Sequence, residues 1–152
     1  DRLIQSRKDE GQALDNDLKL RISNLKRILG EVEKLAPLRL DGIRERIDRS
    51  LDEIRQKVAD LDTNRFEQEL IFYIEKLDIN EEVVRLKQHF EYFEQLRSAE
   101  SSNGKKLQFL AQEIGREINT IGSKANNASI QRLVVEMKDQ LEKIKEQVLN
   151  IL

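Results

Sequence analysis

The sequence contains no cysteine or tryptophan, and it has only one proline and six glycines among its 152 residues. The absence of cysteine excludes disulfides, zinc–thiolate sites and thiol nucleophiles, and it fits a reducing compartment. Low aromatic, glycine and proline content, together with abundant Glu, Lys, Arg and Leu, indicates long helices rather than sheet. No apolar run approaches the ~20 residues that a membrane-spanning helix needs, and no signal peptide is visible, so no membrane partner is expected.

Charged residues make up 37% of the chain, with 27 basic and 29 acidic residues and a formal net charge of −2. This balance argues against disorder and against a generally basic surface for nucleic acid, so any such contact must be a local patch. The length suggests one domain or an elongated helical bundle. Because the chain begins with Asp1 and is already in a helical pattern at Leu3, we expect a fragment or a processed product.

Apolar residues at steps of three and four predict an all-α, elongated bundle of about six helices. Two of these are long and coiled-coil-like, and their narrow apolar seams favour self-association. Pro37 is predicted to end the first helix, because the residue before a proline is pushed out of the α region. Residues 1–61 should therefore form a long helical hairpin. The two seams consist of Leu18, Ile22, Leu25, Leu29 and Val32, and of Leu40, Ile43, Ile47, Leu51, Ile54, Val58 and Leu61.

Residues 62–152 should form a C-terminal helical domain of four helices. The suitable N-cap residues are Asp62, Thr63 or Asn64, then Asp78 or Asn80, and finally Asn127 or Ser129. Gly122 is well placed to end the helix before the last one. The four expected apolar stripes contain Phe66, Leu70, Ile71, Ile74 and Leu77; Val83, Leu86, Phe90 and Phe93; Leu107, Leu110, Ile114, Ile118 and Ile121; and Ile130, Val134, Met137, Leu141, Ile144, Val148 and Ile151.

The only histidine, His89, shares a helix face with Arg85 and Glu81 at spacings of four residues. An unperturbed pKa near ~6.5 suits a general acid or base at neutral pH. The alternative is an ordinary exposed or half-buried helix histidine. The sequence leaves both open.

Glu113 and Glu117 lie one helical turn apart, so their carboxylates can converge on a hard cation such as Mg²⁺ or Mn²⁺. Arg116 alongside them can pair with a phosphate through a bidentate contact. Spacing alone is a weak metal signal, because glutamate pairs of this kind also occur on solvated helix faces with i,i+4 charge partners.

The string Asn119-Thr120-Ile121-Gly122-Ser123-Lys124 combines a glycine, two hydroxyls and a lysine. Such a group makes a plausible phosphate-binding turn. It is not a Walker loop, since the glycine–lysine spacing differs and no strand precedes it. The alternative is a polar turn that only supplies helix caps.

Several strings resemble the YicC family of bacterial proteins, in family order over almost the whole chain. They are Glu10-Gly11 with Leu14; Asp78-Ile79, Glu81-Glu82, Arg85-Leu86 and His89; Gln112-Glu113, Arg116-Glu117 and 119–124; and 134–138 with 142–144. The resemblance implies cytoplasmic endoribonucleases that depend on divalent metal ions and assemble into oligomers, with a hexamer as the expected form. It also implies an additional N-terminal domain that this sequence lacks.

The resemblance further implies a site for cleaving single-stranded RNA, with Mg²⁺ or Mn²⁺ as the only cofactor. His89, Glu113 and Glu117 take the catalytic roles, and the two glutamates also bind the metal. Two departures from the family pattern, Gly115 for Asn and Gln108 for Asp, lie near this face in the sequence. The alternative is a non-catalytic helical oligomerisation or adaptor module. The implied substrate-binding residues are Arg85, Arg116, Asn119, Thr120, Ser123 and Lys124.

Overall fold

The computed structural model describes residues 2–58, 62–99 and 103–151, and this part of the chain contains helices and no strand. The all-α prediction is therefore confirmed, but the described residues form five helices instead of six. None of these five is long and apolar enough to span a membrane. The helices are α1 (Arg2–Lys57), α2 (Thr63–Leu77), α3 (Asn80–Ser98), α4 (Gly104–Lys124) and α5 (Ala128–Ile151).

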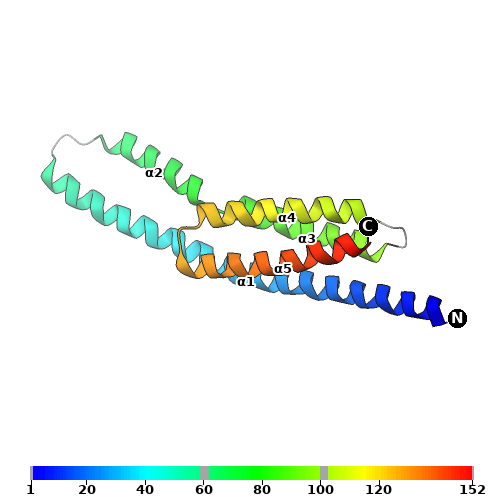
Figure 1. The fold of residues 1–152 in the computed structure, drawn as a ribbon. Coiled ribbons are helices and arrows are strands. Elements are labelled where there is room, and N and C mark those ends of the chain that lie inside the picture. The colour runs from blue at the N-terminus through cyan, green and yellow to red at the C-terminus, as the bar shows by residue number, and fades with distance from the viewer. Residues whose placement is uncertain (1, 59–61, 100–102, 152) are drawn as a thin grey trace.

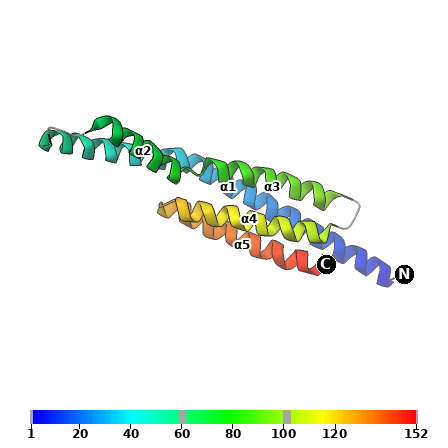
Figure 2. The same cartoon turned by 90° about the horizontal axis from the view of Figure 1, so that it is seen from above.

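Four of the helices form an elongated antiparallel bundle (Figure 1). Both α1 and α4 pack against α3 and α5, which closes a ring of four helices around one core. The view from above shows α2 apart from this bundle, beside the far end of α1 (Figure 2). The apolar stripes predicted for α3 and α4 are buried throughout, as is that of α5 apart from Ile151, and so is the first seam of α1.

Helix α1 runs without interruption through Pro37, so the predicted hairpin over residues 1–61 is wrong. Proline in a helix interior removes one backbone donor, and its ring clashes with the carbonyl four residues earlier, which costs about 3 kcal/mol. Here Val32 is fully buried before the proline and Arg39 is buried just after it. Packing on both sides therefore outweighs the lost hydrogen bond.

Beyond the bundle the second seam of α1 has few partners. Leu51 is buried, but Ile54 and Val58 are exposed, and Leu61 lies outside the described residues. Helix α2 contacts this end of α1 and buries only Ile74. The described chain thus shows an arm built from two helices, without an extended coiled coil.

The predicted helix starts are partly confirmed. The Asp62 carboxylate accepts a hydrogen bond from the Arg65 amide, and the Asn127 side chain accepts one from the Ile130 amide at 3.0 Å. The helix before the last one was predicted to end at Gly122. This prediction is wrong, because the corresponding helix, α4, continues to Lys124 and the turn is confined to residues 125–127.

A side chain of α5 satisfies the carbonyls at the end of α4. The Gln131 amide donates to the carbonyls of Gly122 and Ala125, at 2.6 Å each. Carbonyls at a helix C-terminus have no partner within the helix, so this contact compensates for them. Helix α4 can therefore extend past the glycine.

Candidate active site between α3 and α4

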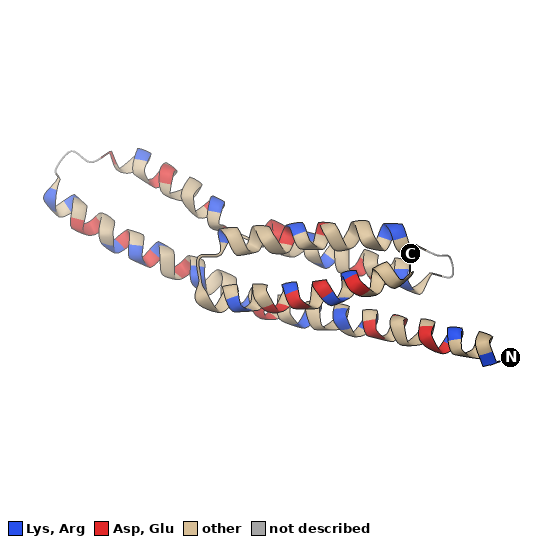
Figure 3. Ribbon diagram, in the orientation of Figure 1, with Lys and Arg blue, Asp and Glu red and all other residues tan. Residues whose placement is uncertain are grey.

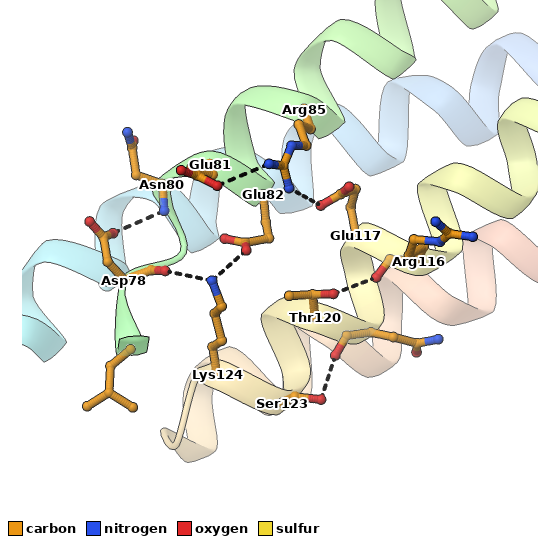
Figure 4. Close-up of polar contacts among 12 residues, drawn as sticks. Asp78, Asn80, Glu81, Glu82, Arg85, Arg116, Glu117, Thr120, Ser123 and Lys124 are labelled. Atoms are coloured by element: carbon orange, nitrogen blue, oxygen red, sulfur yellow. Dashed lines mark hydrogen bonds and ion pairs between the residues drawn. The ribbon is translucent and has the colours of Figure 1, made fainter. Parts of the chain in front are cut away.

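Two ion pairs set the register between α3 and α4. Arg85 Nη1 lies 3.7 Å from Glu117 Oε2, and Lys124 Nζ lies 2.7 Å from Glu82 Oε1. Both pairs join one helix to the other, as Figure 4 shows. The antiparallel packing thus brings together the two segments that carry most of the polar residues singled out in the sequence.

Glu117 is the more enclosed of the two predicted metal-binding glutamates, with a side chain that is 9% exposed. Its charge is offset by Arg85, whose half-exposed guanidinium also pairs with Glu81 at 3.0 Å. A carboxylate taken out of water needs such a partner. Arg85 itself remains open to solvent and can contact a ligand.

Glu113 and Arg116 form the solvent-facing side of the site, one turn from Glu117. The Glu113 side chain is 24% exposed and lies 3.7 Å from Arg116 Nη2, while the Arg116 side chain is 74% exposed. Two carboxylates and two guanidiniums therefore alternate along this part of the α3–α4 surface. Such an arrangement can hold both a cation and a phosphate.

The number of carboxylates at this site bears on which mode of divalent-cation binding it could support. Within the described residues no three or more acidic or histidine side chains are grouped so that they could enclose a metal ion. Mg²⁺, however, usually takes one or two carboxylates from the protein and completes its octahedron with water and substrate phosphate. Glu113 and Glu117 match that requirement and would leave the remaining positions to substrate and solvent.

His89 lies half-buried on α3, one turn beyond Arg85. Because α3 and α4 are antiparallel and Arg85 lies opposite Glu117, the helical turn of α3 that contains His89 lies opposite the turn of α4 that contains Glu113. No hydrogen bond or ion pair joins His89 to either glutamate in the described structure. The three predicted catalytic residues thus lie on two helices that pack together, and they do not form a bonded triad in the described structure.

The predicted phosphate-binding turn is instead the last part of α4, so its backbone amides are used within the helix. The Thr120 hydroxyl donates to the Arg116 carbonyl at 3.0 Å, and the Ser123 hydroxyl donates to the Asn119 carbonyl at 3.1 Å. A hydroxyl has one proton to donate, so both side chains must rotate before they can bind a phosphate. Their predicted substrate role stays a prediction.

Lys124 is held inside the protein. Besides Glu82, its ammonium contacts the Asp78 carbonyl at 3.4 Å, and its side chain is 31% exposed (Figure 4). Glu82 is 3% exposed, and its second oxygen is buried without a hydrogen-bond partner in the described structure. If Lys124 moved from Glu82 to a phosphate, the Glu82 carboxylate would remain buried without this charged partner.

The structural role of Glu82 was not predicted from the sequence, where the residue stood out as part of a string that resembles the family. The residue does lie in the first turn of α3, where the helix dipole favours an acidic side chain. Its burial, however, depends on Lys124, which reaches it from the end of α4. Spacing within one helix carries no signal for a contact of this kind.

Arg39 was also missed, although it is buried and joins three helices. Its guanidinium donates to the carbonyl of Lys124 at 3.0 Å and to the carbonyl of Leu77, at the C-terminal ends of α4 and α2. Burial lowers the pKa of Arg39, and the nearby Asp78 charge acts in the opposite direction. A signal existed: steps of four and three from Val32 through Ala36 reach Arg39, if the seam is continued through the proline.

The two departures from the family pattern do not lie on the side of α4 that faces α3. A Cβ at Gly115 would be 3.1 Å from Leu141 Cδ2 on α5, and Gln108 lines a groove that includes α5 residues. Glu117, by contrast, faces α3. Gly115 therefore serves the close approach of α4 and α5 and removes no ligand from the Glu113–Glu117 pair.

Comparison with known proteins identifies one family. Residues 32–152 match the family described as "Endoribonuclease YicC-like, C-terminal". The chain is similar to a protein named "Probable endoribonuclease YicC" from Clostridioides difficile (strain 630), with 39% identity over 150 residues, which cover 99% of this chain and 51% of that protein.

A second protein of the same name, from Haemophilus influenzae (strain ATCC 51907 / DSM 11121 / KW20 / Rd), is 32% identical over 148 residues. These residues cover 97% of this chain and 50% of that protein. The chain thus spans about half the length of the curated relatives it matches.

Proposed function

Because the chain belongs to the YicC-like endoribonuclease family, we propose that it carries the site of a divalent-metal-dependent endoribonuclease that cleaves single-stranded RNA. The observation that carries the proposal is the Arg85–Glu117 contact, which joins the two motif-bearing helices beside a second carboxylate, Glu113. Carboxylates for a cation next to guanidiniums for phosphates are the groups that phosphodiester cleavage requires.

Each residue of this site has a distinct proposed role. Glu113 and Glu117 would hold Mg²⁺ or Mn²⁺, and the bound ion would supply positive charge near the scissile phosphate. Arg85 and Arg116 bind and orient the flanking phosphates, since both guanidiniums are at least half exposed. His89 would accept the proton of the attacking water or hydroxyl through its imidazole and would return it to the leaving oxygen.

Asn119, Thr120, Ser123 and Lys124 form the second part of the proposed RNA contact. The side chains of Thr120, Ser123 and Lys124 bond within the protein, so RNA must compete with Glu82 for Lys124 and with carbonyls of α4 for the hydroxyls. We therefore expect a smaller contribution to RNA affinity from these three residues than from Arg85 and Arg116.

The proposal includes assembly into a homo-oligomer, with a hexamer as the expected form. Basic and acidic residues are interspersed along the helices (Figure 3), so RNA needs a local basic path, which several copies can build together. Exposed apolar side chains on α2, at Ile71, Phe72 and Tyr73, provide contact area for another copy. Light scattering of the full-length protein after gel filtration tests the mass, and a monomer would refute this part.

The activity is tested with labelled single-stranded RNA and the full-length protein, in Mg²⁺ or Mn²⁺ and after chelation. We expect cleavage only with metal, and we expect Glu113→Gln/Glu117→Gln to abolish both cleavage and Mn²⁺ binding measured by electron paramagnetic resonance. Glu136→Gln, at an exposed position of α5, is the matched control. Metal-independent cleavage, or full activity in the double variant, refutes the assignment.

The chemistry of the product ends then separates two mechanisms. A 5′-phosphate indicates that water attacks the scissile phosphorus, whereas a cyclic 2′,3′-phosphate indicates attack by the 2′-hydroxyl of the RNA. We expect the 5′-phosphate, since the acidic pair can hold a cation beside the scissile phosphate.

The second candidate function is a non-catalytic helical oligomerisation or RNA-degradation adaptor module. One observation favours it: Glu113, Glu117 and Lys124 each already have an oppositely charged partner within the chain. A well-folded oligomer that binds RNA without metal and never cleaves it, even at full length, would select this candidate.

A further inference from the structure

A groove of about 180 Å³ opens between α4 and α5. Ala111, Val148 and Leu149 contribute its apolar lining, and Gln108, Gln112 and Lys145 contribute polar groups. The volume lies below the roughly 300–1,000 Å³ typical of sites for drug-sized ligands, so the groove suits a small group.

The polar groups in this groove are available to a ligand. The side-chain amides of Gln108 and Gln112 make no hydrogen bond to another of the described residues. Lys145 Nζ lies 3.6 Å from Glu142 Oε1, and its side chain is 40% exposed, so this pair is open to exchange with solvent or ligand. Two amides can therefore donate and accept, and one ammonium can donate.

Gly115 connects this groove to the candidate active site. A Cβ added there would lie 4.0 Å from Lys145 Nζ, so the ammonium sits close to the α4 backbone beside Arg116. Gln112 also directly precedes Glu113 in the chain. A nucleic-acid strand that crosses the Glu113–Arg116 surface can thus reach the groove without leaving α4.

We propose that the groove between α4 and α5 binds one unpaired base of the RNA next to the cleavage site. The base ring lies on the apolar lining, the amides of Gln108 and Gln112 bond its edge, and Lys145 pairs with an adjacent phosphate. Proteins read single-stranded RNA through such unstacked bases. This inference rests on the proposed function, because it takes RNA as the substrate.

A base fits this groove better than an apolar side chain from a second copy. A dry protein contact would bury two amides without partners, which costs free energy, whereas a base offers both donors and acceptors to them. The positive charge of Lys145 also complements a phosphate and would be unfavourable in an apolar contact.

The test measures equilibrium binding of a short single-stranded RNA to the full-length protein by fluorescence anisotropy, with RNA integrity checked on a gel. Each nucleotide is replaced in turn by an abasic one. For the wild type we expect a penalty of about tenfold in Kd at one position, as two lost hydrogen bonds imply. In Gln108→Ala/Gln112→Ala the penalty should be several-fold smaller than in the wild type, because only the contact of the ring with the apolar lining is left to lose.

Lys145→Ala should weaken binding of every RNA in the series, because a phosphate contact carries no base information. Lys143→Ala, an exposed lysine on the same helix, is the matched control and should keep both affinity and the abasic penalty. A wild type without any abasic penalty, or a double variant that keeps it, overturns the inference. A Gln108→Ala/Gln112→Ala variant that differs from the wild type only in its oligomeric mass also overturns the inference.

This readout is independent of cleavage. If Glu117→Gln retains full cleavage while the abasic penalty depends on the two glutamines, the active-site assignment fails and the groove stands. If Glu117→Gln abolishes cleavage but the abasic penalty does not depend on Gln108 and Gln112, the proposed function stands and the groove assignment fails.

Discussion

Arg85 of α3 and Glu117 of α4 lie 3.7 Å apart, and this contact closes the interface at the centre of the candidate site. Glu117 is nearly enclosed, whereas Arg85 is half exposed. The pair therefore has one side fixed by packing and one side that faces a ligand. That asymmetry is what a site needs if its carboxylate is to stay in place while its guanidinium contacts substrate.

Removal of Lys124 should destabilise the protein, because it leaves the Glu82 carboxylate buried without a partner. We expect Lys124→Met to lower the free energy of unfolding by about 3 kcal/mol, measured by urea denaturation. The double variant Glu82→Leu/Lys124→Met should recover most of this loss, since no unpaired charge remains. Equal losses in the single and double variants would contradict the account.

The same double variant separates the two roles of Lys124. If the lysine also binds RNA, as its place in the proposed site requires, the folded double variant should show a raised KM with little change in kcat. An unchanged KM would assign Lys124 to the structure alone.

Arg39 should contribute strongly to stability, because it supplies hydrogen bonds to the C-terminal ends of two other helices. We expect Arg39→Ala to cost about 2–3 kcal/mol, as the carbonyls of Leu77 and Lys124 lose a charged donor. Arg44→Ala, an exposed arginine of the same helix, should change stability by less than about 0.5 kcal/mol. Similar effects of the two substitutions would show that Arg39 is not buried.

Replacement of Pro37 tests whether α1 is continuous. In an unbroken helix, Pro37→Ala restores an amide donor and should stabilise the protein by about 1–3 kcal/mol in thermal or chemical unfolding. A proline that serves a turn between two helices behaves in the opposite way, because the substitution then loses a favourable constraint. A destabilised Pro37→Ala variant would therefore support the predicted hairpin over residues 1–61 and contradict a continuous α1.

Gly115 and Gly42 should respond differently to alanine. Nothing lies within 4 Å of a Cβ at Gly42, so Gly42→Ala should gain about 0.5–1 kcal/mol from helix propensity. At Gly115 the same gain is opposed by Leu141 Cδ2, only 3.1 Å from the new atom, and we expect a smaller gain or a loss. Equal stabilisation at both positions would show that the α4–α5 contact is loose.

Much of the fold could be predicted from the sequence. The stripe from Leu107 to Ile121 and the cap at Asn127 follow from spacing and local chemistry, and both are confirmed. Pro37 and Gly122 were misjudged for the same reason. Local preference favours a helix end at each, but Arg39 and Gln131 supply tertiary bonds that propensity does not include.

The candidate site was only partly predictable. The turn-to-turn spacing of Glu113 and Glu117 could be read from the chain, but the partners of Glu117 and Lys124 depend on how α3 packs against α4. Gly115 illustrates the same limit. Gly115 lies between Glu113 and Glu117 in the sequence, which suggests a place beside the proposed metal ligands, whereas the packing places it against α5.

The most direct test of the central claim is the rate of single-stranded RNA cleavage by the full-length Glu117→Gln variant, with folding and oligomeric mass verified. The account predicts a loss of at least about 100-fold in kcat, because a neutral amide cannot hold the cation or balance Arg85. Glu136→Gln should cleave at the wild-type rate. Wild-type cleavage by Glu117→Gln would contradict the assignment of the active site to the α3–α4 interface.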